Sequence, residues 1–364
     1  MLSSPISVSV FCDHPAEGWY SMTRYAQGLA YGFARLEMTD LSLQFLTPPN
    51  PWPVPRGMFW RRLTFPLWCR QHQGMVNHVL DHSYGHLVYG LDASRTVVTV
   101  HDISPLLFPG KKLGLSQMMW RWAWRGAVQA GYYITDSCFV RQTLVERFGF
   151  VAERVKVVPL GVEAGFRPFS ADVVAALRAK YQLPPLPVLL HVGGVQKRKN
   201  FEGLIEAVAN LHREGITAVL IHAGRPPTPR QQTQIEANGL SQFVHCLGYV
   251  TDEELVNLYN LADVFVFPSL YEGFGIPPLE AMACGTPVIT SNAASLPEVV
   301  GDAGILVDAT DVEALTDAIR RVLEDSTLAA TLRAKGLARA RQFTWERTAQ
   351  ETAAVYRAIW EAMA

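Results

Sequence analysis

The chain has 364 residues, which is too long for one ordinary hydrophobic core and fits two domains of about 150 to 200 residues each. Hydrophobic residues make up 49% of the sequence and charged residues 18%, a balance typical of globular rather than disordered proteins. The formal net charge of -1 argues against a partner held by bulk charge, so we expect no nucleic-acid binding.

The five cysteines are scattered without a C-x-x-C pair, which favours neither a disulfide framework nor a zinc site. The N-terminal sequence has no basic stretch before its apolar residues and reaches a charge at Asp13, which argues against a signal peptide. Every apolar run meets a charge, Gly or Pro well before the roughly 20 residues that a bilayer span needs. We therefore expect a cytoplasmic protein.

Short apolar runs alternate with segments of helical period along the chain, a pattern typical of parallel sheets covered by helices. The runs predict strands at 7–11, 41–46, 95–100, 132–135 and 155–159 in the first half, and at 188–192, 218–223, 243–247, 264–267, 288–290 and 305–307 in the second. A Gly- and Pro-rich stretch at 162–187 predicts a linker, and the apolar spacing of 345–360 predicts a closing helix.

These elements predict an α/β protein with two doubly wound, parallel-sheet domains. We expect domains at 1–165 and 166–344, and a C-terminal helix at 345–364 that packs back on the first domain. Two domains allow a cleft between them. In doubly wound sheets ligands bind beyond the carboxyl ends of the strands, so the residues that follow each strand are the candidates for a site.

The first candidate segment follows the strand at 188–192 and reads G-G-V-Q-K-R-K-N before a helical pattern. Glycines let the backbone approach an anion, and a helix N-terminus contributes partial positive charge. Arg198 and Lys199 can neutralise a diphosphate that gains charge as a sugar leaves. The spacing is not that of a P-loop, and a solvated basic turn is the alternative interpretation.

The second candidate segment is the Gly-rich loop that follows the strand at 264–267. Pro277 and Pro278 predict a helix start, which places Glu272 in the loop and Glu280 in the first helical turn. Carboxylates suit sugar hydroxyls, so one can hold a hexose and the other the ribose of a nucleotide. The alternatives are a glycosidase-like acid and base pair, whose spatial separation the sequence does not give, and complementation of the helix dipole by Glu280.

The first half offers weaker candidates. His101 and Asp102 directly follow the strand at 95–100, and Ser137 follows the strand at 132–135; a buried structural histidine and a helix-capping serine are the alternatives. Seven of the nine Trp precede residue 125, and six of these seven mingle with Arg and Lys at 51–70 and 111–127. This pattern predicts peripheral docking at a membrane, while a Trp-rich core or a sugar-stacking acceptor groove is the alternative.

The run E-G-F-G-I-P-P-L-E, followed by A-M-A-C-G-T-P-V-I, resembles the E-x7-E segment of GT4-type (group 1) retaining glycosyltransferases of the GT-B fold. G-x-x-x-K-R-K-N resembles their phosphate loop, and G-Y-V-T-D-E-E-L at 248–255 and F-T-W-E-R at 343–347 extend the resemblance over nearly all of the C-terminal half. It implies two Rossmann-like domains facing across a cleft and a hexosyltransferase of the EC 2.4 class. The lack of a D-x-D motif agrees with chemistry that needs no metal and no cofactor.

The resemblance also implies residue roles. The implied catalytic residues are His101, which would position the sugar, with Arg198 and Lys199 on the donor diphosphate and Glu272 on the sugar hydroxyls; Glu280 would bind the ribose. Further implied donor contacts are Gly18, Gly194, Tyr249, Val250, Gly273, Phe274, Gly275 and Ile276, and Asp102 and Ser137 lie on the acceptor side. Many members carry an Arg where this chain has Gly194, so phosphate binding would rest on Arg198 and Lys199.

Together these features predict retaining transfer of a hexose from a nucleotide-sugar donor to a glycan, lipid-linked or small-molecule acceptor. The R-K-N and H-D combination resembles bacterial GT4 mannosyltransferases, which favours GDP-mannose as donor and a role in polysaccharide biosynthesis. The expected location is cytoplasmic, with peripheral contact at the inner face of the cytoplasmic membrane. The alternatives are a sugar-nucleotide epimerase or a phosphorylase on the same fold, and a non-catalytic sugar-nucleotide-binding scaffold.

Overall fold

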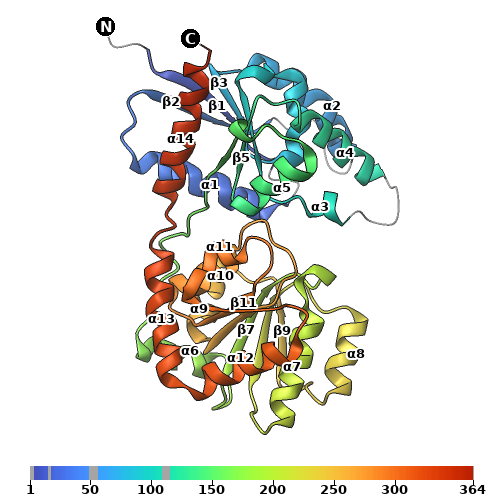
Figure 1. The fold of residues 1–364 in the computed structure, drawn as a ribbon, viewed down its shortest axis with the longest axis vertical. Coiled ribbons are helices and arrows are strands. Elements are labelled where there is room, and N and C mark those ends of the chain that lie inside the picture. The colour runs from blue at the N-terminus through green and yellow to red at the C-terminus, as the bar shows by residue number, and fades with distance from the viewer. Residues whose placement is uncertain (1–3, 15–17, 49–55, 109–114, 364) are drawn as a thin grey trace. The chain divides into compact units, whose positions relative to one another are not determined.

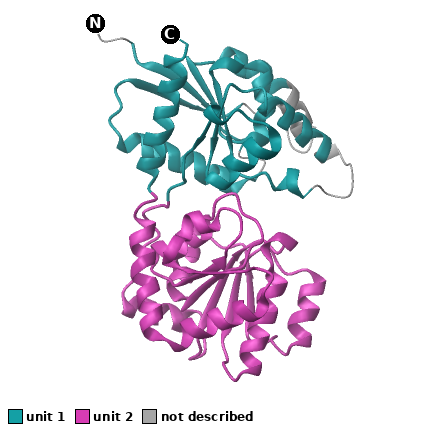
Figure 2. Cartoon of the chain, in the orientation of Figure 1, with its two compact units in different colours: residues 1–161, 344–364 teal, residues 162–343 magenta. Residues whose placement is uncertain are grey.

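The computed structural model describes residues 4–14, 18–48, 56–108 and 115–363, with the backbone alone at 56–63, 115 and 116. The chain folds into two compact units (Figure 2): unit 1 is residues 1–161 with 344–364, and unit 2 is residues 162–343. Unit 1 is therefore built from both ends of the chain.

Unit 1 contains a six-stranded parallel sheet in the order β2-β1-β3-β4-β5-β6 (Figure 1). The strands are β1 (Ile6–Phe11), β2 (Leu41–Leu46), β3 (Val76–Val79), β4 (Thr96–Val100), β5 (Tyr132–Thr135) and β6 (Val155–Val157). The α-helices are α1 (Tyr20–Arg35), α2 (Arg56–Gln71), α3 (Ser104–Leu107), α4 (Leu115–Ala127), α5 (Cys138–Phe148) and α14 (Trp345–Glu361).

Unit 2 contains a second six-stranded parallel sheet in the order β12-β11-β10-β7-β8-β9. The strands are β7 (Val188–Gly193), β8 (Val219–Gly224), β9 (Val244–Gly248), β10 (Val264–Phe267), β11 (Val288–Ser291) and β12 (Ile305–Val307). The α-helices are α6 (Ala171–Lys180), α7 (Phe201–Arg213), α8 (Pro229–Ala237), α9 (Asp252–Leu261), α10 (Ile276–Ala283), α11 (Leu296–Val300), α12 (Val312–Glu324) and α13 (Ser326–Ala340). The strand order reverses between β7 and β10, which makes their carboxyl ends the topological switch point of this unit.

The core of unit 2 follows from the sequence pattern. The central strands β7 and β10 are buried along their apolar runs, and the apolar face of α7 packs on the sheet beside α12, with Leu204, Ile205 and Val208 at 0% exposure. Two doubly wound parallel sheets were predicted from this alternation of apolar runs and helical patterns, and the structure confirms them.

Two elements differ from the prediction. The sequence V-N-H-V was not recognised as a strand because its middle residues are polar, yet β3 lies inside the sheet of unit 1. His78 is fully buried there, and both of its ring nitrogens have hydrogen-bond partners: one lies 2.7 Å from Tyr356 Oη and the other 2.7 Å from Thr99 Oγ1. These bonds make it possible to bury the polar ring. The predicted linker at 162–187 contains helix α6, which packs against α9.

The C-terminal helix α14 packs against α1, β1 and β3 within unit 1. Its first residue, Trp345, lies directly on α1: a Cβ at Gly28 would be 2.1 Å from the Trp345 indole, and one at Gly32 would be 2.1 Å from the Trp345 carbonyl oxygen. The two glycines one helical turn apart therefore permit the close contact of these helices.

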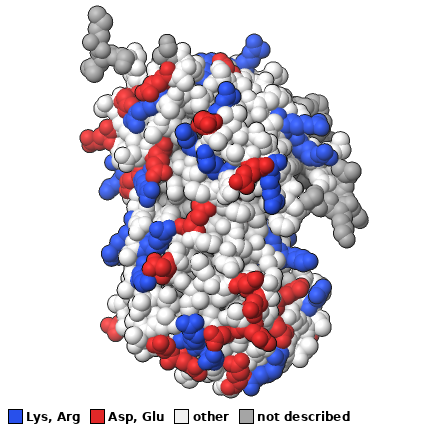
Figure 3. All heavy atoms as spheres, viewed as in Figure 1, with Lys and Arg blue, Asp and Glu red and all other residues white. Residues whose placement is uncertain are grey.

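Surface charge is mixed in sign. Lys and Arg side chains are interspersed with Asp and Glu side chains over the face drawn in Figure 3. Within the described residues, no helix is both long enough and apolar enough to cross a bilayer.

Candidate functional site

The switch point of unit 2 brings together the two segments that the sequence singled out. Lys199 Nζ lies 2.6 Å from Glu272 Oε1, and Arg198 Nη1 lies 3.5 Å from Glu272 Oε2. The backbone joins the same loops, because the Leu270 amide donates to the Arg198 carbonyl oxygen at 2.7 Å. One carboxylate thus holds two cations, and the three side chains are only 12% to 28% exposed.

Local backbone conformation sets the positions of the cations. Lys197–Lys199 form a 3₁₀ turn after β7, and Asn200 then adopts φ +52° as the N-cap of α7. The Asn200 side chain donates to the Ala309 carbonyl oxygen at 2.6 Å, which anchors this left-handed residue. The first amides of α7 follow immediately, so two cations and a helix N-terminus lie together, an arrangement suited to an anion.

Gly194 follows Gly193, the last residue of β7, at the start of the candidate phosphate loop. A Cβ placed on Gly194 would lie 2.0 Å from Gln196 Oε1, so the Gln196 side chain occupies the space beside it. Within this loop the positive charges near Glu272 come from Arg198 and Lys199.

The Gly-rich loop after β10 leads into α10, whose N-cap is Gly275 with φ +136°. Pro277 and Pro278 lack an N–H, so the first turn of α10 offers donors only through Ile276 and the Gly275 cap. Because the helix begins at Ile276 rather than at the prolines, Glu280 is its fifth residue. The prediction that Glu280 lies in the first turn was wrong: it lies in the second.

Glu280 is 1% exposed and lies against α9. Its Oε2 accepts a hydrogen bond from the Tyr259 hydroxyl at 2.8 Å. The sequence pattern did not point to Tyr259, since a tyrosine in an amphipathic helix is usually core. In the structure Tyr259 both packs in the core and orients the buried carboxylate of Glu280 through its hydroxyl.

Apart from Gly18, the remaining residues that were predicted to contact the donor also lie in unit 2. Tyr249 and Val250 form the turn after β9, and Tyr249 is 80% exposed. Gly273 and Phe274 are buried in the loop that carries Glu272, and the Phe274 ring packs edge-on against Phe343.

In unit 1, His101 follows β4 and is 8% exposed. Its Nδ1 lies 2.8 Å from Asp136 Oδ2 and its Nε2 lies 2.8 Å from the Leu80 carbonyl oxygen. Burial alone would lower the pKa of this ring, but the carboxylates of Asp136 and Asp81 outweigh it and raise the pKa of His101 to about 9. An imidazolium donates through both nitrogens, which fits both contacts. Contact with a donor sugar stays a prediction, and it would require one ring nitrogen to exchange its partner.

The charge of His101 should make unfolding pH-dependent. Since its folded pKa of about 9 exceeds the ordinary value of about 6.5, its contribution to stability is complete below about pH 6.5 and is lost as the pH rises through about 9. We expect Asp136→Asn to lower the melting temperature at pH 7 and to flatten the fall between pH 7 and 9, measured by calorimetry. Parallel curves for the two proteins would show that Asp136 does not hold the charge.

The other unit 1 candidates have local structural partners. Asp102 accepts from the Ser104 amide at 2.6 Å and from its hydroxyl at 3.0 Å, at the start of α3. Ser137 is the N-cap of α5 and accepts from the Val140 amide, which is the capping role that the sequence left open. Gly18 has φ +70° and precedes α1. Acceptor and donor contacts of these residues stay predictions.

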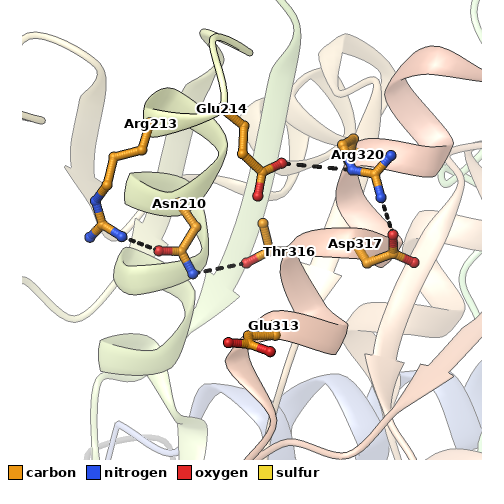
Figure 4. A pocket seen from close by; sticks show the side chains of 7 residues that line it. All are labelled: Asn210, Arg213, Glu214, Glu313, Thr316, Asp317 and Arg320. Carbon is orange, nitrogen blue, oxygen red and sulfur yellow. Dashed lines mark hydrogen bonds and ion pairs between the residues drawn. The ribbon is translucent and has the colours of Figure 1, made fainter.

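A groove between α7 and α12 has a volume of about 410 Å³ and lies near the end of α7 farthest from Lys199 (Figure 4). Its charged lining consists of three carboxylates, Glu214, Glu313 and Asp317, and two arginines, Arg213 and Arg320. Arg320 pairs with Asp317 and, at 3.7 Å, with Glu214, and Arg213 bonds to Asn210. Because carboxylates outnumber arginines in this lining, the groove does not favour a phosphate, and we do not assign the site here.

Several known proteins are similar to this chain in sequence or in fold. Residues 8–166 match Glycosyltransferase Family 4, and residues 174–339 match the glycosyl transferases group 1. The O-antigen chain mannosyltransferase B of Escherichia coli is 36% identical over 272 residues, which cover 73% of this chain and 71% of that protein. The serotype-specific mannosyltransferase WbdA of Escherichia coli is 34% identical over 266 residues, 70% of this chain but 32% of that protein. Anabaena HepE, solved in complex with UDP and glucose, has a TM-score of 0.75 at 21% identity and covers 97% of this chain and 100% of its own.

Two Rossmann-like units with these sheets define the GT-B fold, which the likeness to HepE supports over almost the whole chain. The chain belongs to the GT4, or group 1, glycosyltransferases, and it is a glycosyltransferase of the EC 2.4 class. The predicted fold class, family and enzyme class are confirmed.

Proposed function

We propose that this enzyme is a retaining mannosyltransferase that uses GDP-mannose to extend a polysaccharide. The observation that carries the proposal is the cluster of Arg198, Lys199 and Glu272 at the switch point of unit 2. The choice of mannose is supported by the two Escherichia coli relatives, which are named as mannosyltransferases, and the polysaccharide acceptor by the O-antigen function in the name of the first.

We infer that unit 2 binds the donor and unit 1 the acceptor. Lys199 and Arg198 bind the diphosphate, and they release part of their interaction with Glu272 as they do so. Glu272 then accepts hydrogen bonds from sugar hydroxyls, Glu280 from the ribose, and Tyr249 and Val250 border the base. Because Glu280 is 1% exposed, ribose binding requires a neighbouring side chain to move aside.

The transfer itself fits a front-face mechanism. The glycosidic C–O bond to the diphosphate breaks, the acceptor oxygen bonds to the anomeric carbon on the same face, and the departing phosphate oxygen takes the acceptor proton. Arg198 and Lys199 stabilise the negative charge that grows on the leaving diphosphate. The family resemblance favours contact of Glu272 with the sugar hydroxyls, so we assign it as the sugar clamp rather than as the nucleophile.

Donor choice is tested by incubating the enzyme with GDP-mannose, UDP-glucose and UDP-N-acetylglucosamine and measuring nucleotide release with and without oligosaccharide acceptors. We expect acceptor-dependent release of GDP and a product with the donor's anomeric configuration by NMR. Release of UDP from the uridine donors, with no release of GDP from GDP-mannose, would contradict the mannosyl assignment. An altered sugar nucleotide without release would indicate an epimerase, and binding without turnover a scaffold.

Peripheral membrane contact was predicted from the Trp- and Arg-rich segments at 51–70 and 111–127. Trp52 lies outside the described residues, as does the Trp60 side chain. The α4 tryptophans are half-buried and stack within unit 1: Trp120 stacks on Trp124, and Trp122 stacks on His86 and Tyr89. This packing favours the core alternative for these indoles.

We infer that any membrane contact of α4 uses its exposed residues instead, Met118, Arg121 and Arg125, which recur at helical spacing. We expect the enzyme to float with phosphatidylglycerol vesicles at low salt and less at high salt, and Arg121→Glu with Arg125→Glu to abolish flotation. Neutral phosphatidylcholine vesicles are the control. Absence of binding to anionic vesicles at either salt concentration would rule out the membrane contact.

A further inference from the structure

Three hydroxyl groups from β11 and the segment after it hold the Gly-rich loop of unit 2. Thr290 Oγ1 donates to the Phe267 carbonyl oxygen at 2.8 Å, and Ser291 Oγ donates to that of Ser269. Further along, Ser295 Oγ lies within hydrogen-bonding distance of two carbonyl oxygens, those of Glu272, at 2.9 Å, and Phe274, and its single proton is shared between them. All three side chains are 0% exposed, so water does not compete for these bonds.

Ser295 is unusual among them because it stands at the N-cap of α11. A serine at this position normally accepts a bond from the first-turn amides of its own helix, but Ser295 makes no such capping bond. Its hydroxyl is turned to the loop instead. The next residue, Leu296, packs against the same loop, since a Cβ on Gly275 would lie 3.0 Å from Leu296 Cδ2.

Peptide geometry gives these bonds a consequence. In a trans peptide the C=O and the following N–H point in opposite directions. Because Ser295 binds the carbonyls of Glu272 and Phe274, the amides of Gly273 and Gly275 are directed away from Ser295. The same bonds fix the backbone of Glu272, whose carboxylate meets Lys199.

We propose that Ser295 is a positioning residue of the donor site: its buried hydroxyl fixes the peptide planes of 272–275, so that Glu272 and the amides of Gly273 and Gly275 face the sugar and the terminal phosphate of the donor. The inference rests on the proposed function of this loop. Ser295 lies outside the E-x7-E segment. Its effect on binding should be confined to the sugar and the terminal phosphate of the donor.

The test compares affinities for GMP, GDP and GDP-mannose, with UMP, UDP and UDP-glucose in parallel, by isothermal titration calorimetry on the full chain. Ser295→Ala should weaken the nucleotide sugar about tenfold, the effect of losing one or two oriented hydrogen bonds, weaken the diphosphate less, and leave the monophosphate unchanged. Ser295→Cys keeps a donor, although a weaker one on a larger atom, and should show a smaller loss in the same order. Should Ser295→Ala fail to fold, the graded loss in Ser295→Cys decides.

Ser291→Ala is the matched control, because it also removes a buried serine hydroxyl. That hydroxyl binds the carbonyl oxygen of Ser269, which precedes Glu272 in the loop. We expect it to weaken the nucleotide sugar less than Ser295→Ala does. An equal loss across all three ligands, or no loss in Ser295→Ala, would overturn the positioning role while leaving the proposed function intact. A wild-type enzyme that binds neither nucleotide sugar would instead contradict the proposed function, and this inference with it.

Discussion

Replacing Lys199 by Ala should lower kcat by about a hundredfold or more while changing KM little. In the proposed mechanism the ammonium group faces a leaving diphosphate whose charge grows in the transition state, and a charge contact that strengthens there acts on kcat. In the ligand-free chain Lys199 also holds Glu272 at 2.6 Å, so the variant loosens the sugar clamp as well. Steady-state kinetics with saturating acceptor measure both parameters.

Lys197→Ala is the matched control for this prediction. Lys197 lies in the same 3₁₀ turn and carries the same charge, but its side chain is exposed. A kcat close to that of the wild type is expected for it. If Lys199→Ala raised KM alone and left kcat unchanged, Lys199 would bind the ground state only and the proposed role in charge stabilisation would be wrong.

The second large effect is on stability, and it concerns the backbone of Gly224, which contacts Gly193. Gly224 ends β8 with φ +136°, and a Cβ on it would lie 1.9 Å from the Gly193 carbonyl oxygen. Gly224→Ala therefore combines backbone strain with a clash against Gly193, the residue that opens the loop carrying Arg198 and Lys199. We expect a loss of about 3 kcal/mol or more in the free energy of unfolding, from ~1–3 kcal/mol for each contribution.

Gly239→Ala separates the two causes. Gly239 also has positive φ, +69°, but nothing lies within 4 Å of a Cβ there, so only the backbone strain of about 1 kcal/mol is expected. Urea unfolding of both variants and the wild type gives the comparison. Similar losses in the two variants would show that β8 can move away from Gly193 without cost.

The sequence predicted the strands of both sheets except β3, and it singled out the two segments that the structure joins at the switch point of unit 2. It succeeded because parallel strands that are buried on both faces appear as uninterrupted apolar runs. Gly-rich turns with charged residues directly after a strand also indicate where a doubly wound sheet binds ligands. It failed at β3, where His78 is buried only because Tyr356, distant in the sequence, supplies a partner.

Contacts formed by the fold could not be read from the sequence. The pairing of Glu272 with Lys199 joins residues 73 positions apart, and neither segment specifies the other. Ser295 and Tyr259 were missed because serine and tyrosine are common in loops and amphipathic helices, and only the three-dimensional structure shows which carbonyls or carboxylates their hydroxyls meet. The raised pKa of His101 likewise depends on a contact with Asp136, which is distant in the sequence.

The central claim is that Arg198 and Lys199 bind the donor diphosphate at the switch point of unit 2. A crystal structure of the enzyme with GDP-mannose bound tests it most directly. We predict phosphate oxygens within hydrogen-bonding distance of Lys199 Nζ and the Arg198 guanidinium, with Glu272 on the hexose hydroxyls. A diphosphate bound elsewhere, with the contacts of both cations to Glu272 unchanged, would contradict the proposal.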